Sequence, residues 1–278
     1  MSDQIEVFGS SVIQHGKSND RAYVMKICPQ DCPTVVDDAV NLAVDNRYSK
    51  IFAKAPAFSR QAFLQERFVE EAKVPNLFNG AEDGYFLSKF MFPERRQEGA
   101  PEIVKKVIAA ANSKFTEVGL VPELDADFTW RIMQKHDAQV MARLYKLVFK
   151  SYPFPIDDPD YLERTMDEDV IYHGIFREGE LIALSSAEID FSSKNVEMTD
   201  FATRPDCRGQ GFATYLLEKM ETDVRNKGIC TAYTIARAYS YGMNITFAKH
   251  GYRFAGTLTN NTQISGQLES MNVWYKTL

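Results

Sequence analysis

The stretch RPDCRGQGFATYLL, residues 204 to 217, places an arginine and two glycines directly before an apolar helical pattern. Arg208 precedes Gly209, and Gly211 precedes Phe212, the first of the apolar residues at helical spacing. Glycines there let the backbone approach a ligand and turn successive N–H groups the same way. First-turn N–H groups have no partner within a helix, so they form an anion site to which the arginine adds charge. The stretch therefore predicts a pyrophosphate site.

The same glycines also allow a second interpretation, in which they only form a tight turn. A preceding strand, the arginine, the glycine spacing and the following helix together favour the anion site. The P-loop pattern GxxxxGK[ST] is absent, and the dinucleotide pattern GxGxxG fails because Thr214 stands at its third glycine. The loop is therefore expected to bind the phosphate groups of a ligand that uses neither of these two motifs.

On these residues the sequence resembles the GNAT family of acyl-CoA-dependent N-acetyltransferases. The family signature Gln/Arg-x-x-Gly-x-Gly/Ala is met by Arg208, Gly211 and Ala213. Further along, GMNITFAKHGYRFAG (residues 242–256) resembles the second signature, an Asn-bearing helix followed by Lys-x-Gly-Tyr/Phe. The resemblance covers about residues 127–278 and implies a GNAT acyl-CoA N-acyltransferase fold with acetyl-CoA as co-substrate.

The resemblance also implies which residues hold acetyl-CoA. A strand pairs with the pantetheine arm, the loop and first helical turn hold the pyrophosphate, and an asparagine flanks the thioester end. In that order, the residues are Phe201, Ala202 and Thr203; Arg208, Gly209, Gln210, Gly211, Phe212, Ala213 and Thr214; and Asn244.

The whole-chain pattern is similar to that of the β-lysine N-acetyltransferases within this family. The closer match depends on YFLSKFM (residues 85–91) and TDFATRPDCRGQGFATYLL (residues 199–217). It implies acetylation of the ε-amine of β-lysine to give the osmolyte Nε-acetyl-β-lysine. A polyamine or other small-amine N-acetyltransferase, and an acyl-CoA-binding sensor without catalysis, are the alternatives.

Acetyl transfer needs a neutral amine, and a lysine-type amine with a pKa near 10.4 costs roughly 4–5 kcal/mol to neutralise at pH 7. A carboxylate, or a water held by one, must therefore take a proton. Regular strand alternation places Glu197, Thr199 and Phe201 on one face and Asp200 on the other. Glu197 resembles the GNAT catalytic glutamate, Asp200 is the second candidate, and a solvated edge position is the alternative. A backbone N–H of this strand is expected to meet the oxyanion.

The sequence does not identify the general acid that protonates the leaving thiolate. Many GNAT enzymes use a tyrosine where this chain has Phe247, which cannot donate a proton. Tyr239 and Tyr241 lie just ahead of that helix, and packing is the favoured role for both. The thiolate can also leave without a dedicated acid.

A pocket for β-lysine should offer both a cation and an anion away from the reacting amine. Arg237 is the candidate cation, and the acidic loop with Asp157, Asp158 and Asp160 is the candidate anion. A surface arginine and a solvated loop are the alternative.

The elements that position these residues predict an α+β fold with a mixed sheet. From residue 127 onward the periodicities give the order β-α-α-β-β-β-α-β-α-β-β. Before it, two strands are expected within residues 5–27, and helices over residues 34–47, 59–72 and 101–115. We therefore divide the chain into residues 1–125, resembling a degenerate partial GNAT domain without a cofactor loop, and residues 126–278, the catalytic domain.

Composition limits the remaining functions. The net charge of -6 argues against general nucleic-acid binding, which requires a basic face. No apolar run approaches 18 residues and the opening residues do not read as a signal peptide, so we expect a cytoplasmic protein without membrane spans. Four cysteines are too few for a disulfide framework, and His136, His173 and His250 show no ligand spacing, so no metal is expected.

Overall fold

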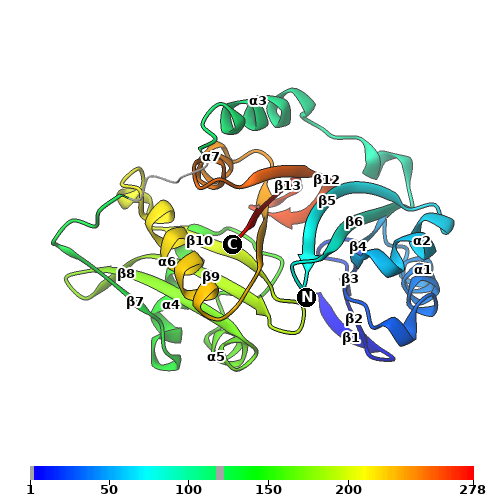
Figure 1. The fold of residues 1–278 in the computed structure, drawn as a ribbon, viewed down its shortest axis with the longest axis horizontal. Coiled ribbons are helices and arrows are strands. Elements are labelled where there is room, and N and C mark those ends of the chain that lie inside the picture. Colours follow the sequence, from blue (N-terminus) through cyan, green and yellow to red (C-terminus); the bar gives the residue numbers. More distant parts are fainter. Residues whose placement is uncertain (1–2, 117–121) are drawn as a thin grey trace.

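A single sheet runs through the whole computed structural model, which describes residues 3–116 and 122–278. Its 13 strands follow the order β1-β2-β3-β4-β6-β5-β12-β13-β11-β10-β9-β8-β7. The strands of the first half lie on the right of Figure 1, and β12 and β13 separate them from the other strands of the second half. The two halves therefore share one hydrogen-bonded sheet. Helix α3 of the first half lies at the top beside α7.

The elements of the first half are β1 (Gln4–Phe8), β2 (Ser11–Gly16), β3 (Arg21–Lys26), α1 (Thr34–Asn46), β4 (Lys50–Pro56), α2 (Ala57–Gln65), β5 (Val69–Phe78), β6 (Glu82–Phe90) and α3 (Pro101–Asn112). Those of the second half are β7 (Phe128–Ile132), α4 (Ala138–Val148), α5 (Pro159–Asp167), β8 (Val170–Arg177), β9 (Glu180–Asp190), β10 (Asn195–Thr203), α6 (Phe212–Asn226), β11 (Thr231–Arg237), α7 (Tyr241–Lys249), β12 (Arg253–Ile264) and β13 (Gln267–Thr277). The order predicted from residue 127 onward and the α+β class are confirmed.

Two predictions in the first half are wrong. The helix expected over residues 59–72 ends at Gln65, because Arg67 is left-handed (φ 63°) and Phe68 turns back onto Phe63 with an edge-on ring contact of 5.0 Å. Residues 69–72 then begin β5. Three strands form where two were expected, because Gly9 (φ 64°) makes a turn that separates β1 from β2.

The two halves repeat one topology. In each half, two antiparallel strand pairs lead to a parallel neighbour through a helix: β3-α1-β4 in the first half, and β10-α6-β11 in the second. The hairpins β5-β6 and β12-β13 then occupy matching places. Read outward from the β5-β12 junction, the two strand orders therefore match, except that β7 is an extra strand at the far edge of the second half. This repeat supports the division into residues 1–125 and 126–278, which stays a prediction.

The junction depends on a close backbone approach. Gly256 pairs with Ala72, and a Cβ at Gly256 would lie 2.1 Å from the carbonyl oxygen of Glu71. The buried Lys50 bonds Glu71 at 2.8 Å and the carbonyl of Thr259 at 2.7 Å. Side chains of the first half thereby hold the irregular part of β12 in place.

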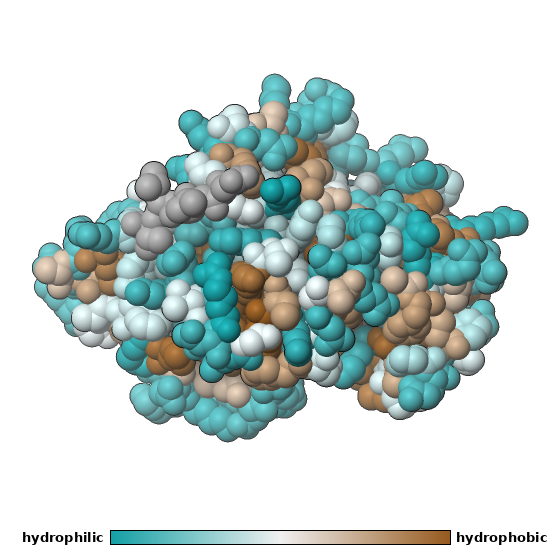
Figure 2. All heavy atoms as spheres, viewed as in Figure 1, coloured by the Kyte–Doolittle hydropathy of each residue, from teal (hydrophilic) through white to brown (hydrophobic). Residues whose placement is uncertain are grey.

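Helices cover both faces of the second half. Helices α6 and α7 pack on one face through a cluster that includes Met220, Phe247 and Trp274. On the other face, α4 and α5 pack through Met141 and Leu162. The surface in Figure 2 is mostly hydrophilic with scattered apolar patches. Among the described residues, no helix is long and apolar enough to span a bilayer.

Candidate active site

The predicted anion loop precedes α6. Gly209 (φ 83°) and Gly211 (φ 80°) are both left-handed, and Gly211 is the N-cap residue without a side-chain cap. The Tyr215 N–H donates to Gly211 O at 3.0 Å, so the N–H groups just before it have no partner within the helix. A Cβ at Gly209 would meet nothing within 4 Å, and Arg208 is exposed beside it. The loop therefore has the N–H groups without a helical partner and the open space that an anion site requires, and its binding of the acetyl-CoA pyrophosphate stays a prediction.

Strands β10 and β11 separate below this loop. Their parallel pairing covers Asn195–Glu197 against Thr231–Tyr233. Both strands continue beyond it, β10 to Thr203 and β11 to Arg237. The edge of β10 at Phe201, Ala202 and Thr203 thus diverges from β11, and its pairing with a pantetheine arm stays a prediction.

A β-bulge in β10 changes which side chains share a face. Its register against β9 shifts between Thr199 and Ala202, and Asp200 has a positive φ of 54°. Asp200 therefore lines the same cavity as Glu197, whereas Phe201 turns to the opposite face and packs edge-on against Phe247 at 5.6 Å. The predicted sharing of a face by Glu197 and Phe201 is wrong because the bulge inserts an extra residue.

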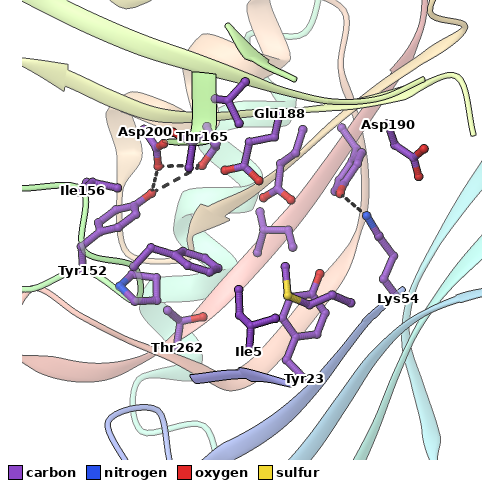
Figure 3. A pocket seen from close by; sticks show the side chains of 18 of the residues that line it. Ile5, Tyr23, Lys54, Tyr152, Ile156, Thr165, Glu188, Asp190, Asp200 and Thr262 are labelled. Atoms are coloured by element: carbon purple, nitrogen blue, oxygen red, sulfur yellow. Dashed lines mark hydrogen bonds between the residues drawn. The ribbon is translucent and has the colours of Figure 1, made fainter. Parts of the chain in front are cut away.

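A cavity of about 430 Å³ lies where the two halves meet. In Figure 3, Glu188 and Asp200 face Ile5 and Tyr23 across it, and Lys54 approaches from β4. Its ionisable lining includes these carboxyl and basic groups: Glu168, Glu188, Asp190, Glu197 and Asp200, with Arg21, Lys26 and Lys54. Acidic side chains outnumber basic ones, so the cavity suits a cationic ligand.

Asp200 is held by a hydrogen-bond network. The Ser186 hydroxyl donates to Oδ2 at 2.6 Å, and the Tyr152 phenol donates to Oδ1 at 2.5 Å. Burial raises the pKa of Asp200, and the hydrogen bonds from Ser186, Tyr152 and Thr199 oppose that rise by favouring the carboxylate. The carboxyl group is therefore oriented as well as buried.

Glu197 belongs to a second network, which joins the two halves of the chain. Burial raises the pKa of Glu197, while the charge of Lys54 and a hydrogen bond from Tyr233 oppose the rise. Lys54 Nζ in turn donates to the Tyr233 hydroxyl at 3.0 Å. Glu188, directly across from Glu197 on β9, has its pKa raised well above the usual value by burial and then by the charges of Glu197 and Asp200.

Asn244 uses its side-chain amide inside the protein. Nδ2 donates to the carbonyls of Arg237 (3.0 Å) and Ser240 (2.7 Å). Oδ1 accepts from Asn272 (2.9 Å) and Trp274 (2.8 Å). Asn244 therefore fixes the turn before α7, and its place beside the thioester stays a prediction.

The tyrosines considered as general acids lie apart from the cavity lining in the described residues. Tyr239 donates to Glu98, and burial followed by this hydrogen bond raises its pKa. Tyr241 is 44 % exposed, whereas Phe247 is buried against Tyr252. None of the three is placed by this geometry to protonate a group in the cavity.

The expected pocket charges also lie elsewhere. Arg237 forms a two-pronged ion pair with Glu269, with N–O distances of 2.9 and 2.6 Å. Asp158 caps α5 by accepting from the Asp160 N–H, and Asp157 lines a separate, smaller cavity. These predictions are wrong because the cavity takes its cations from the first half of the chain and carboxylates such as Glu188 and Asp200 from β9 and β10.

The histidines and acidic side chains do not gather into a metal site in the described residues. Over residues 3–116 and 122–278, no group of three His, Cys, Asp or Glu side chains could hold an ion. His173 and His250 are buried, and burial lowers the pKa of each to about 4. Both imidazoles are therefore neutral at physiological pH.

Comparisons with known proteins identify the family of this chain. The model of the Acetyltransferase (GNAT) family matches residues 141–252. A β-lysine N6-acetyltransferase of Methanococcus maripaludis is 38% identical over 99% of this chain and 98% of its own length. An N-acetyltransferase of Bacillus subtilis is 29% identical over 97% of this chain and 96% of its own length. The solved spermidine N-acetyltransferase of Vibrio cholerae, at 16% identity, covers 55% of this chain and 95% of its own with a TM-score of 0.47. The chain belongs to the GNAT family of acetyltransferases, which use acetyl-CoA as co-substrate.

Proposed function

We propose that this protein transfers the acetyl group of acetyl-CoA to the ε-amine of β-lysine, giving Nε-acetyl-β-lysine. The carboxyl cluster formed by Glu188, Glu197 and Asp200 carries the proposal, because these side chains line one cavity beside the point where β10 and β11 separate. β-Lysine has two ammonium groups, and the full-length relative of Methanococcus maripaludis is named for this reaction. The cavity volume of about 430 Å³ suits a small amino acid.

Acetyl-CoA supplies the activated acyl group as a thioester. The first-turn N–H groups from Gly209 to Thr214, with Arg208, would hold its pyrophosphate. The edge of β10 at residues 201–203 would pair with the pantetheine arm. This arrangement directs the thioester toward the carboxyl cluster, where the bulge takes the backbone at Asp200 out of the regular β9 ladder and offers N–H groups for an oxyanion.

Glu197 is the proposed general base. The acceptor enters as an ammonium ion and gives a proton to this carboxylate before its nitrogen attacks the carbonyl carbon. A new C–N bond forms, the C–S bond breaks, and the sulfur leaves with the electron pair and takes up the second proton lost by the nitrogen, giving the free thiol and the amide. The raised pKa of Glu197 brings its basicity closer to neutral pH, which favours this proton transfer.

Asp200 is the second candidate base. Its carboxylate is already engaged by Tyr152 and Ser186, so we assign it mainly to holding the ammonium group. A primary ammonium has three donors, and Glu188, Glu197 and Asp200 offer acceptors from two neighbouring strands.

Use of acetyl-CoA further suggests a cytoplasmic site of action, with the product serving as a compatible solute.

Thiol release with a panel of amines tests the proposal. β-Lysine should be acetylated on its ε-nitrogen at least about tenfold faster than cadaverine, because a pocket for a carboxylate leaves a buried cation unpaired when that group is missing. Mass spectrometry of the product locates the acetyl group. Faster turnover of cadaverine or spermidine would favour a polyamine enzyme, and acetyl-CoA binding without thiol release would favour a sensor.

A further inference from the structure

Arg21 is a buried cation without an acidic partner. It begins β3, is 4 % exposed and lines the cavity. Throughout the described ranges, 3–116 and 122–278, no carboxylate forms an ion pair with it. Burial lowers its pKa to about 10, although the charges of Asp3 and Glu197 oppose this, and the guanidinium stays charged at neutral pH. A charge held in this way is unfavourable until an anion reaches it.

The hydrogen-bond acceptors of Arg21 are all neutral, and Nη2 donates to Gln14 Oε1 at 3.5 Å. Nη1 donates to the carbonyl of Asn261 at 2.6 Å and to the Thr262 hydroxyl at 3.2 Å. The guanidinium lies over the rings of Tyr23 and Phe52, 5.3 and 5.7 Å from their centroids. Nε is buried and has no hydrogen-bond partner. One donor of the planar guanidinium is therefore unsatisfied, in a residue that lines the cavity.

The position of Arg21 complements the carboxyl cluster. Glu188, Glu197 and Asp200 come from β9 and β10, whereas Arg21 comes from β3 in the other half of the molecule. One cavity thus presents acceptors for ammonium groups and a separate donor for an anion. A zwitterionic amino acid has both kinds of charge, whereas a polyamine has only the first.

We propose that Arg21 binds the carboxylate of the acceptor amino acid and thereby selects amino acids over simple diamines. The inference rests on the proposed function and adds the residue that recognises the head group. The first half of the chain, which lacks a cofactor loop, thereby takes part in the reaction by recognising the substrate.

Arg95 provides a matched control. It is 7 % exposed, and its Nε donates to the carbonyl of Asn260, next to the residue that Arg21 bonds. Arg95 also lies 3.6 Å from a carboxylate oxygen of Asp20, and it is not among the described residues lining the cavity. The two arginines therefore both hold β12, but only Arg21 contributes to the cavity.

The experiment compares β-lysine with pentane-1,4-diamine, which keeps both amines at the same spacing and lacks only the carboxylate. For the unaltered protein, kcat/KM should favour β-lysine by about 100-fold or more. Arg21→Gln should lower kcat/KM for β-lysine by about 100-fold, mainly through KM, and leave the diamine nearly unchanged. Arg95→Gln should retain the preference, whatever its effect on stability.

Other outcomes separate the two proposals. An equal loss on both substrates in Arg21→Gln, or an unchanged preference, would overturn the role of Arg21. If the unaltered protein prefers the diamine, the proposed β-lysine activity itself fails. If Arg21→Gln does not fold, Arg21→Lys keeps the cation but loses the planar fork, and should still lose about tenfold selectively on β-lysine. Unchanged selectivity in that variant would also overturn the inference.

Discussion

Glu188 and Glu197 lie directly opposite each other on β9 and β10, and both line the same cavity. Like charges at opposed positions destabilise a sheet. Burial raises the pKa of both carboxyl groups, and Glu197 and Asp200 raise that of Glu188 further. The free protein therefore holds an unfavourable cluster that a bound ammonium group would relieve.

Glu188→Gln should accordingly stabilise the free protein at neutral and higher pH. The pKa of Glu188 is raised in the folded state, so below the unfolded-state pKa of about 4.3 the side chain is protonated in both states and does not reduce stability. As pH rises above that value, the unfolded chain ionises more readily than the folded one, and the free energy of unfolding falls. Urea denaturation should show a gain on the order of 1 kcal/mol near pH 8 that disappears near pH 4. The exposed Glu163→Gln is the control, and a loss of stability near pH 8 would contradict the argument.

Glu197→Gln should lower kcat by about 100-fold at pH 7, because the amide cannot accept the amine proton. The loss of kcat should become smaller as pH rises toward the pKa of the free amine, because an amine that is already neutral needs no base. Stopped-flow thiol release over a pH series measures both effects, and calorimetry should find acetyl-CoA binding retained. A deficit that is independent of pH would transfer the role of base to Asp200 or to water.

Tyr152→Phe should move the acidic limb of the kcat/KM profile to higher pH. The Tyr152 phenol donates to Asp200 and stabilises its charged form, so its removal raises the pKa of Asp200 further. Tyr145→Phe is the matched control, because the buried Tyr145 hydroxyl has no hydrogen-bond partner. Equal profiles for the two variants would show that Asp200 need not be ionised during turnover.

Gly209→Val should weaken acetyl-CoA binding by well over tenfold, because the side chain enters the space predicted for the pyrophosphate. Gly228, at the other end of α6, has a similar φ (78° against 83°), and a Cβ at either glycine meets nothing within 4 Å. Gly228→Val therefore imposes comparable backbone strain away from the loop. Calorimetric titration of both variants distinguishes ligand exclusion from strain, and equal affinities would mean that the glycines only form a turn.

Local patterns predicted much of the second half and the loop. Helical and strand periodicity gave its element order, and the Arg208–Gly211 spacing located the start of α6. The bulge at Asp200 could not be predicted from alternation, because its positive φ depends on packing against β9 and the hydrogen bonds to its carboxylate. Arg21 and Lys54 were missed because their importance comes from contacts between halves, which leave no local sequence signal.

The place of β12 in the sheet also has a consequence for biosynthesis. Glu71 bonds Thr259, which is 188 residues further along the chain, and β5 pairs with β12 at Ala72 and Gly256. While the ribosome synthesises the intervening residues, the emerging first half has an open strand edge at β5, the kind of edge that promotes association between chains. The first half therefore depends on a late-synthesised strand to close its edge, and translation speed or chaperone binding over that interval should affect the yield of active protein.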